Sequence, residues 1–147
     1  MPGDDPHDLA RFVDAHAPVI GQVFAELAAG RKRTHWMWFV FPQLRGLGRS
    51  LAAAHYGIGS MAEAHAYMAH PLLGARLREA AALVLAAKAD SPEAIFGPID
   101  ALKFRSSMSL FALACGDETC QANLDRWYDG QPDPETVRRL GAAPFRS

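Results

Sequence analysis

The sequence predicts an all-α fold, on three observations. Alanine is frequent, the β-branched residues are scattered, and no segment sustains the two-residue alternation of a half-buried strand. Proline follows a plausible helix cap four times, at positions where its missing N–H would have no partner anyway. Glycine follows several apolar-periodic segments, where it can take the left-handed conformation that ends helices. We therefore expect a compact multihelical bundle of about nine helices, several of them short.

The first half of the chain holds most of the expected helix starts. Thr34 can cap a short helix that ends near Val40, because Pro42 disfavours helical backbone in the residue before it. Ser60 and Glu63 have the spacing of a capping box, in which each side chain satisfies a backbone N–H of the other residue. The expected starts, in chain order, are Pro6, Pro18, Thr34, Ser50, Ser60 and Pro71.

The second half predicts four more helices. Ser91 caps a short one that ends at Gly97, and Pro98 then opens a long helix that runs to about Ala114. Proline at the first helical position is favourable because its fixed backbone angle suits the helix. The last two helices are expected at residues 117–129 and 134–140.

Length and charge narrow the class of protein. A chain of 147 residues has the size of one domain, expected over residues 1–147 with a core at about 6–140 and short flexible tails. The formal net charge of -1 argues against a general attraction to nucleic acid or to anionic membranes. Apolar runs fall short of the roughly 18 residues that suggest a membrane span, and the N-terminus lacks a signal-peptide pattern. We expect a soluble, cytoplasmic protein.

Metal and cofactor motifs are absent from the sequence. Cys115 and Cys120 are five residues apart, which is neither a redox pair nor a zinc-knuckle spacing. The six histidines show no metal-ligand spacing, and neither a P-loop nor a dinucleotide fingerprint occurs. The sequence therefore predicts reduced thiols, no metal and no cofactor. It identifies no reaction and leaves open whether the protein is an enzyme.

An aromatic segment is the first candidate site. Two tryptophans, two phenylalanines and a histidine follow directly after three consecutive cations, of which Arg33 is the last. His35 is expected in the first turn of a helix, where free backbone N–H groups attract anions. Trp36 and Trp38 can stack a base or a sugar, and the amide of Gln43 follows. The alternative is that the aromatic rings are core and the cations are solvated.

A second candidate lies in the long helix that starts at Pro98. Asp100, Lys103 and either Ser106 or Ser107 share one side of this helix. Two adjacent serines are unfavourable in a helix interior, and they are easier to explain if they line a tight contact or a pocket. The alternative is that Lys103 and Asp100 form only a surface ion pair.

Several motifs together carry a resemblance to a known family, and they are spread over nearly the whole chain. They are GRKRTHWMWFVFPQLRGLGRS from Gly30, Tyr56, Ile58, Glu63, Tyr67, HPLLGARL from His70, IFG from Ile95, Asp100, Lys103 and SSMSLF from Ser106. This pattern resembles an uncharacterised bacterial family that often carries the label calpastatin. The resemblance covers residues 9–140 and implies a compact multihelical domain with central buried helices, represented by a mycobacterial member. It implies no activity.

The leading functional hypothesis is a pocket for a small anionic ligand, such as a nucleotide, in which a reaction could also take place. Arg33 and Lys103 would neutralise the anion, and His35 would donate or shuttle a proton. A tryptophan would stack on the ligand, and Ser106 or Ser107 would bind it by a hydrogen bond. The alternative is a non-catalytic module whose aromatic patch binds a protein partner. Binding of single-stranded nucleic acid is the weakest of the three hypotheses.

Overall fold

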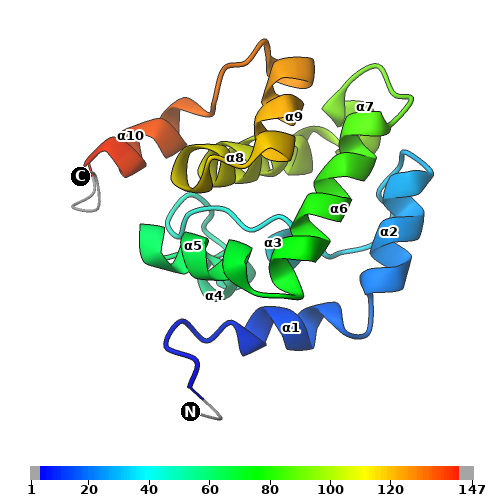
Figure 1. Cartoon of the computed structure of the whole chain (residues 1–147). Helices are drawn as coiled ribbons and strands as arrows, with labels where there is room; N and C mark the ends of the chain where they lie inside the picture. Colours follow the sequence, from blue (N-terminus) through cyan, green and yellow to red (C-terminus); the bar gives the residue numbers. More distant parts are fainter. Residues whose placement is uncertain (1–3, 143–147) are drawn as a thin grey trace.

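The computed structural model describes residues 4–142, and this part of the chain confirms the all-α prediction with ten helices (Figure 1). One isolated parallel β-bridge joins Leu44 to Ile58. Residues 1–3 and 143–147 of the expected flexible tails lie outside the described residues. The helices are α1 (Ala10–His16), α2 (Ile20–Ala28), α3 (Met37–Val40), α4 (Leu51–Tyr56), α5 (Met61–Ala69), α6 (Leu73–Ala86), α7 (Pro92–Phe96), α8 (Pro98–Cys115), α9 (Glu118–Tyr128) and α10 (Pro134–Ala142).

The longest helices, α6 and α8, organise the bundle. Helix α8 packs against α9, α5, α7 and α10, while α6 packs against α9, α2 and α5. Helix α1 lies along the bottom of the view, with α2 at the right and α10 at the left (Figure 1). The short helix α3 contacts α1, α4, α6 and α8, so the aromatic segment enters the core. There, the ring of Phe41 meets that of Phe104 edge to face at 5.0 Å.

Local start signals explain several helices as expected. The hydroxyl of Ser50 accepts a hydrogen bond from the N–H of Ala53 at 3.0 Å, and α4 begins at the residue after Ser50. Ser60 caps α5 in the same way. Ser91 caps α7, which ends at Gly97. Because such caps act within one turn, the sequence alone locates these helices.

Four helices start two or more residues later than the sequence predicts. Helix α2 begins at Ile20 and not near Pro18, and α6 begins at Leu73 and not at Pro71. The carboxylate of Asp5 accepts hydrogen bonds from the N–H groups of Leu9 and Ala10, both at 2.8 Å, so α1 begins at Ala10 and not near Pro6. The expected cap Thr34 does not start a helix, because its hydroxyl and N–H both bind a carboxylate of α2. Helix α3 therefore begins only at Met37, and the prediction that His35 lies in a first helical turn is wrong.

Two buried polar contacts fix α1 to the rest of the bundle. The guanidinium of Arg11 pairs with the carboxylate of Glu63 at 2.6 Å, and each side chain is only 7% exposed. The ring of His16 donates from Nε2 to the carbonyl of Phe39 at 2.5 Å, and its Nδ1 faces the Arg76 guanidinium. Burial lowers the pKa of His16 to about 4, so this ring is neutral at pH 7.

Candidate functional site

Glu26 is a buried carboxylate on α2 that organises the loop between α2 and α3. Its Oε1 accepts hydrogen bonds from the N–H of Arg33 at 2.7 Å, the N–H of Thr34 at 3.1 Å and the indole of Trp36 at 2.9 Å. Its Oε2 accepts from the Thr34 hydroxyl at 2.6 Å and the Gln22 amide at 3.0 Å. Burial alone would raise the pKa of Glu26, but these bonds outweigh it and lower the pKa to about 2. The ionised carboxylate therefore holds the loop in one path.

This loop brings a lysine beside the first turn of α8. The ammonium of Lys32 lies 2.9 Å from Oδ2 of Asp100, and that of Lys103 lies 3.4 Å from Oδ1 of the same residue. Each ammonium also lies over an indole ring, Lys32 over Trp36 at 5.2 Å and Lys103 over Trp38 at 5.1 Å. These are distances at which a cation is attracted to an aromatic face. Two cations share one carboxylate, which leaves one net positive charge in this group.

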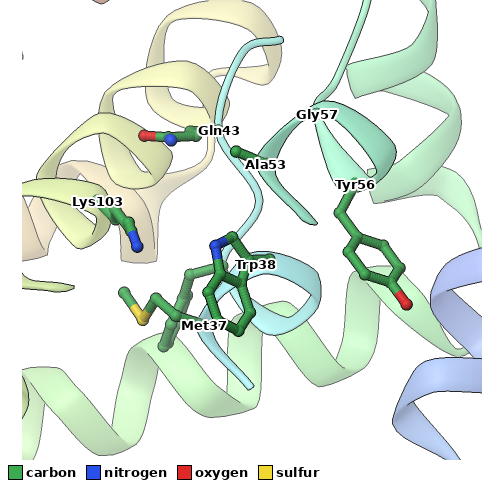
Figure 2. A pocket seen from close by; sticks show the side chains of 8 residues that line it. Met37, Trp38, Gln43, Ala53, Tyr56, Gly57 and Lys103 are labelled. Carbon is green, nitrogen blue, oxygen red and sulfur yellow. The ribbon is translucent and has the colours of Figure 1, made fainter. Parts of the chain in front are cut away.

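Trp38 lies beside a small cavity between α3, α4 and α8. This inner cavity has a volume of about 10 Å³, which is room for roughly one water molecule. Figure 2 shows the indole nitrogen of Trp38 and the ammonium of Lys103 directed toward the same space. The residues that line the inner cavity are Met37, Trp38, Phe41, Gln43, Ala53, Tyr56, Gly57 and Lys103.

A larger and more open groove adjoins this cavity at Met37 and Trp38. This outer groove has a volume of about 330 Å³, within the range of sites for small molecules. Met37 and Trp38 line both the groove and the inner cavity, so the two spaces are neighbours. The residues that line the outer groove are Lys32, His35, Met37, Trp38, Phe96, Gly97, Pro98, Ile99 and Asp100.

Two buried polar atoms lack a hydrogen-bond partner among the residues that the structure describes, Nε1 of Trp38 and Oγ of Ser107. A buried donor without a partner is costly, by about 1–3 kcal/mol, and such atoms are rare in native proteins. The Trp38 N–H lies beside the inner cavity, where a water molecule could accept a hydrogen bond from it. Ser107 is fully buried in the middle of α8 and lines neither of the two spaces.

Five of the predicted site residues come together around these two spaces. His35 and Asp100 line the outer groove, and Gln43 and Lys103 line the inner cavity. Trp38 lies between the two pairs and contributes to both spaces. The aromatic segment and the start of α8 thus lie together around these two spaces, and their role as a ligand site stays a prediction.

The other predicted residues are placed elsewhere. Arg33 is exposed and lines neither space, so the cation at the site is Lys32, one residue earlier. The reason is that the backbone N–H of Arg33 binds Glu26, which fixes the path of the loop. Trp36 is 1% exposed and belongs to the core. Ser106 donates to the carbonyl of Leu102 and faces the loop before α10 instead of the site.

Sequence reasoning missed Glu26 and Lys32. Glu26 had a readable signal, because it lies next to Leu27 and three residues after Val23 on the buried side of α2. A carboxylate on an apolar helix face needs several donors nearby. Lys32 had no such signal, because the sequence does not distinguish among three consecutive cations. The position of Lys32 depends on a contact far along the chain, the hydrogen bond from its N–H to the carbonyl of Ile95 at 2.8 Å.

Thiol and metal chemistry have little support in this structure. Burial raises the pKa of Cys115 to about 11 and holds that of Cys120 well above its ordinary value. Both thiols are free and protonated at neutral pH, and a protonated thiol is a poor nucleophile. Over residues 4–142, no cluster of three His, Cys, Asp or Glu side chains is arranged to hold a metal ion.

In the same part of the chain, no helix has the length and apolarity to cross a membrane.

The fold that carries these residues is shared with other proteins. A family model described as "Protein of unknown function (DUF1810)" matches residues 6–140, and the chain belongs to this family. Its structure is similar to the crystal structure of the conserved hypothetical protein Rv1873 from Mycobacterium tuberculosis, with 54% sequence identity and a TM-score of 0.92. That match covers 95% of this chain and 100% of the mycobacterial chain. No curated protein matches. The resemblance seen in the sequence, including its mycobacterial representative, is thereby confirmed.

Proposed function

We propose that the chain binds a small anionic ligand in the outer groove. The observation that carries this proposal is the pair of ammonium groups, Lys32 and Lys103, that share the single carboxylate of Asp100. Their side chains are 8% and 23% exposed, so solvent and salt screen the remaining positive charge less than they would at an open surface. A phosphate or carboxylate in the groove would neutralise this charge.

Trp38 adds a second means of recognition. Its indole N–H has no hydrogen-bond partner among the described residues and lies beside the inner cavity, where one water molecule could bind it together with the Gln43 amide on the same cavity wall. Its ring can pack against a planar group, as in a nucleotide. His35 is exposed at the rim of the groove and can donate a hydrogen bond or a proton to the bound anion.

The alternative, in which the aromatic segment binds a protein partner, has less support. Trp36 and Phe41 are each 1% exposed and pack inside the bundle. Trp38 and Phe39 are half-buried. The segment therefore presents no large exposed aromatic patch of the kind that a protein interface needs.

A thermal-shift screen tests the proposal. Wild-type protein is heated with nucleotides, ADP-ribose and phosphorylated sugars, and the same compounds are tested on Lys103→Met and on the control Lys88→Met. Methionine keeps the length of the lysine stem over Trp38 but removes the charge, and Lys88 is an exposed lysine that lines neither the groove nor the cavity. A ligand at a hundredfold excess over its dissociation constant stabilises the fold by about 2.7 kcal/mol.

The expected result is that one compound class stabilises the wild type and Lys88→Met but not Lys103→Met. Circular dichroism without ligand would verify that Lys103→Met is folded. If no anion stabilises the wild type, or if Lys103→Met responds equally, the proposal fails. A pull-down for a protein partner would then be the next experiment.

A further inference from the structure

Part of the lining of the outer groove is apolar, and it adjoins exposed aliphatic side chains at the start of α8. Ile99 and Leu102 lie three residues apart on the first turns of α8, on one side of the helix. They are 70% and 66% exposed, although each is a large aliphatic side chain. Single exposed leucines are common on protein surfaces, but two neighbours at the edge of a groove form a continuous apolar surface.

This surface continues into the groove itself. Ile99 lines the groove together with Pro98, Phe96 and Met37, so its side-chain wall offers no hydrogen-bond donor or acceptor along that side. The exposed surface at Ile99 and Leu102 is thus an extension of the groove wall rather than an isolated feature. A ligand that covers it would remove apolar surface from water, which is the main favourable contribution to such contacts.

The polar wall of the same groove carries the charge. Lys32 and Asp100 line it, and Lys103 is joined to them through Asp100. The lining of the groove is therefore mixed, with a net positive charge beside aliphatic and aromatic side chains. The inner cavity behind Trp38 has room for roughly one water molecule and is too small for a phosphate group. The charged group of a ligand must therefore stay in the groove, which the Lys32 ammonium lines.

We propose that the ligand is an amphipathic anion, an aryl or branched alkyl ester of phosphate, or the corresponding carboxylate, whose apolar body lies on Ile99 and Leu102. This inference rests on the proposed anion site and names its ligand class. A nucleobase fits the apolar wall less well, because the polar edges of the base would face side chains without donors or acceptors and would lose their hydrogen bonds to water.

Calorimetric titration with matched probes tests the inference. Inorganic phosphate supplies the anion alone, 1-naphthyl phosphate adds an apolar body, and AMP adds a polar heteroaromatic one. We expect 1-naphthyl phosphate to bind at least tenfold more tightly than phosphate and more tightly than AMP. In the double variant Ile99→Ser with Leu102→Ser, most of the advantage over phosphate should disappear. The control Leu113→Ser, at the other end of the same helix and 47% exposed, should keep it.

The outcomes separate this inference from the proposed function. If phosphate binds the wild type and not Lys103→Met, but 1-naphthyl phosphate is no tighter, the anion site stands and the amphipathic ligand class is wrong. If AMP binds more tightly than 1-naphthyl phosphate, the ligand class is also wrong. If the double serine variant keeps the full advantage, the apolar body does not lie on α8. If none of the three probes binds, the anion site itself is rejected, and the inference falls with it.

Discussion

Glu26 is the residue whose removal should disturb the site most while leaving its lining residues unchanged in identity. The substitution Glu26→Gln keeps the shape of the side chain but removes the charge that accepts five hydrogen bonds, four from the loop before α3 and one from Gln22 of α2. The pKa of Glu26 is lowered to about 2 from an ordinary 4.5. At about 1.4 kcal/mol for each tenfold change, the ionised carboxylate stabilises the fold by about 3 kcal/mol at pH 7.

The pH dependence has a definite sign. Because the pKa of Glu26 is lower in the folded chain than in the unfolded chain, the unfolded chain binds more protons below pH 4.5. The stabilisation is complete well above pH 4.5 and is lost as the pH falls toward 2. By pH 3, about 2 kcal/mol of it should be gone.

Urea unfolding of the wild type and of Glu26→Gln at pH 7 and pH 3 measures this difference. We expect the variant to be less stable by about 3 kcal/mol at pH 7 and by about 1 kcal/mol at pH 3. Glu79→Gln, on the exposed side of α6, is the matched control and should change stability by less than about 0.5 kcal/mol at either pH. If Glu26→Gln lowers the stability by the same amount at pH 7 and at pH 3, the loss does not come from the charge.

Three further changes test the contacts that hold the fold around the site. Burial lowers the pKa of His16 to about 4, so the unfolded chain binds a proton at this residue at a higher pH than the folded chain does. The wild type should therefore lose about 3 kcal/mol of stability as the pH falls from 6.5 to 4, and the urea midpoints of His16→Gln should show no such contribution. Glu63→Ala should cost about 3–5 kcal/mol in the same assay, because it leaves the Arg11 guanidinium buried without its carboxylate. Gly74→Ala should lower the melting temperature sharply, because its Cβ would lie 2.0 Å from the carbonyl oxygen of Met68.

Matched variants serve as controls for these three changes. The loss attributed to His16 is obtained by subtracting the pH profile of His16→Gln, and parallel profiles would contradict the assignment. Glu135→Ala removes an exposed partner of Arg138 and Arg139 and should change the urea midpoint far less than Glu63→Ala does. Gly21→Ala adds a Cβ with no other atom within 4 Å and should not destabilise α2. If Glu135→Ala costs as much stability as Glu63→Ala, burial is not the cause of the loss in Glu63→Ala.

The helices that the sequence locates well are those with a cap inside the chain segment itself. Ser50, Ser60 and Ser91 each accept a hydrogen bond from an N–H three residues later, and nothing outside the turn competes for them. Thr34 looks the same in the sequence, but Glu26 lies within reach of it in the folded chain. A cap signal therefore fails where a distant charged group offers a stronger partner.

The site follows the same rule. The spacing of Asp100 and Lys103 on a helix is a local property, and the structure shows both at the groove or the cavity beside it. The choice between Lys32 and Arg33 depends on where the loop crosses α7, which local sequence does not specify. The adjacent serines of α8 show a second limit of prediction from sequence. Ser106 contacts Asp133, which belongs to a segment whose position relative to α8 has no sequence signal.

The most direct test of the account observes the indole N–H of Trp38. The chain has three tryptophans; the N–H of Trp36 binds Glu26 at 2.9 Å, that of Trp127 binds Asn123 at 3.2 Å, and that of Trp38 has no partner in the described structure. A proton–nitrogen correlation spectrum resolves indole N–H groups separately, and Trp38→Phe assigns the resonance.

Titration with the anion that stabilises the protein most in the thermal-shift screen should move the Trp38 resonance furthest, because the Trp38 side chain lines the groove that the anion occupies. The Trp127 resonance should stay in place, because α9 lines neither the groove nor the cavity. If saturating anion leaves the Trp38 resonance unchanged, or moves that of Trp127 more, the ligand does not bind beside Trp38 and the account of the site is wrong.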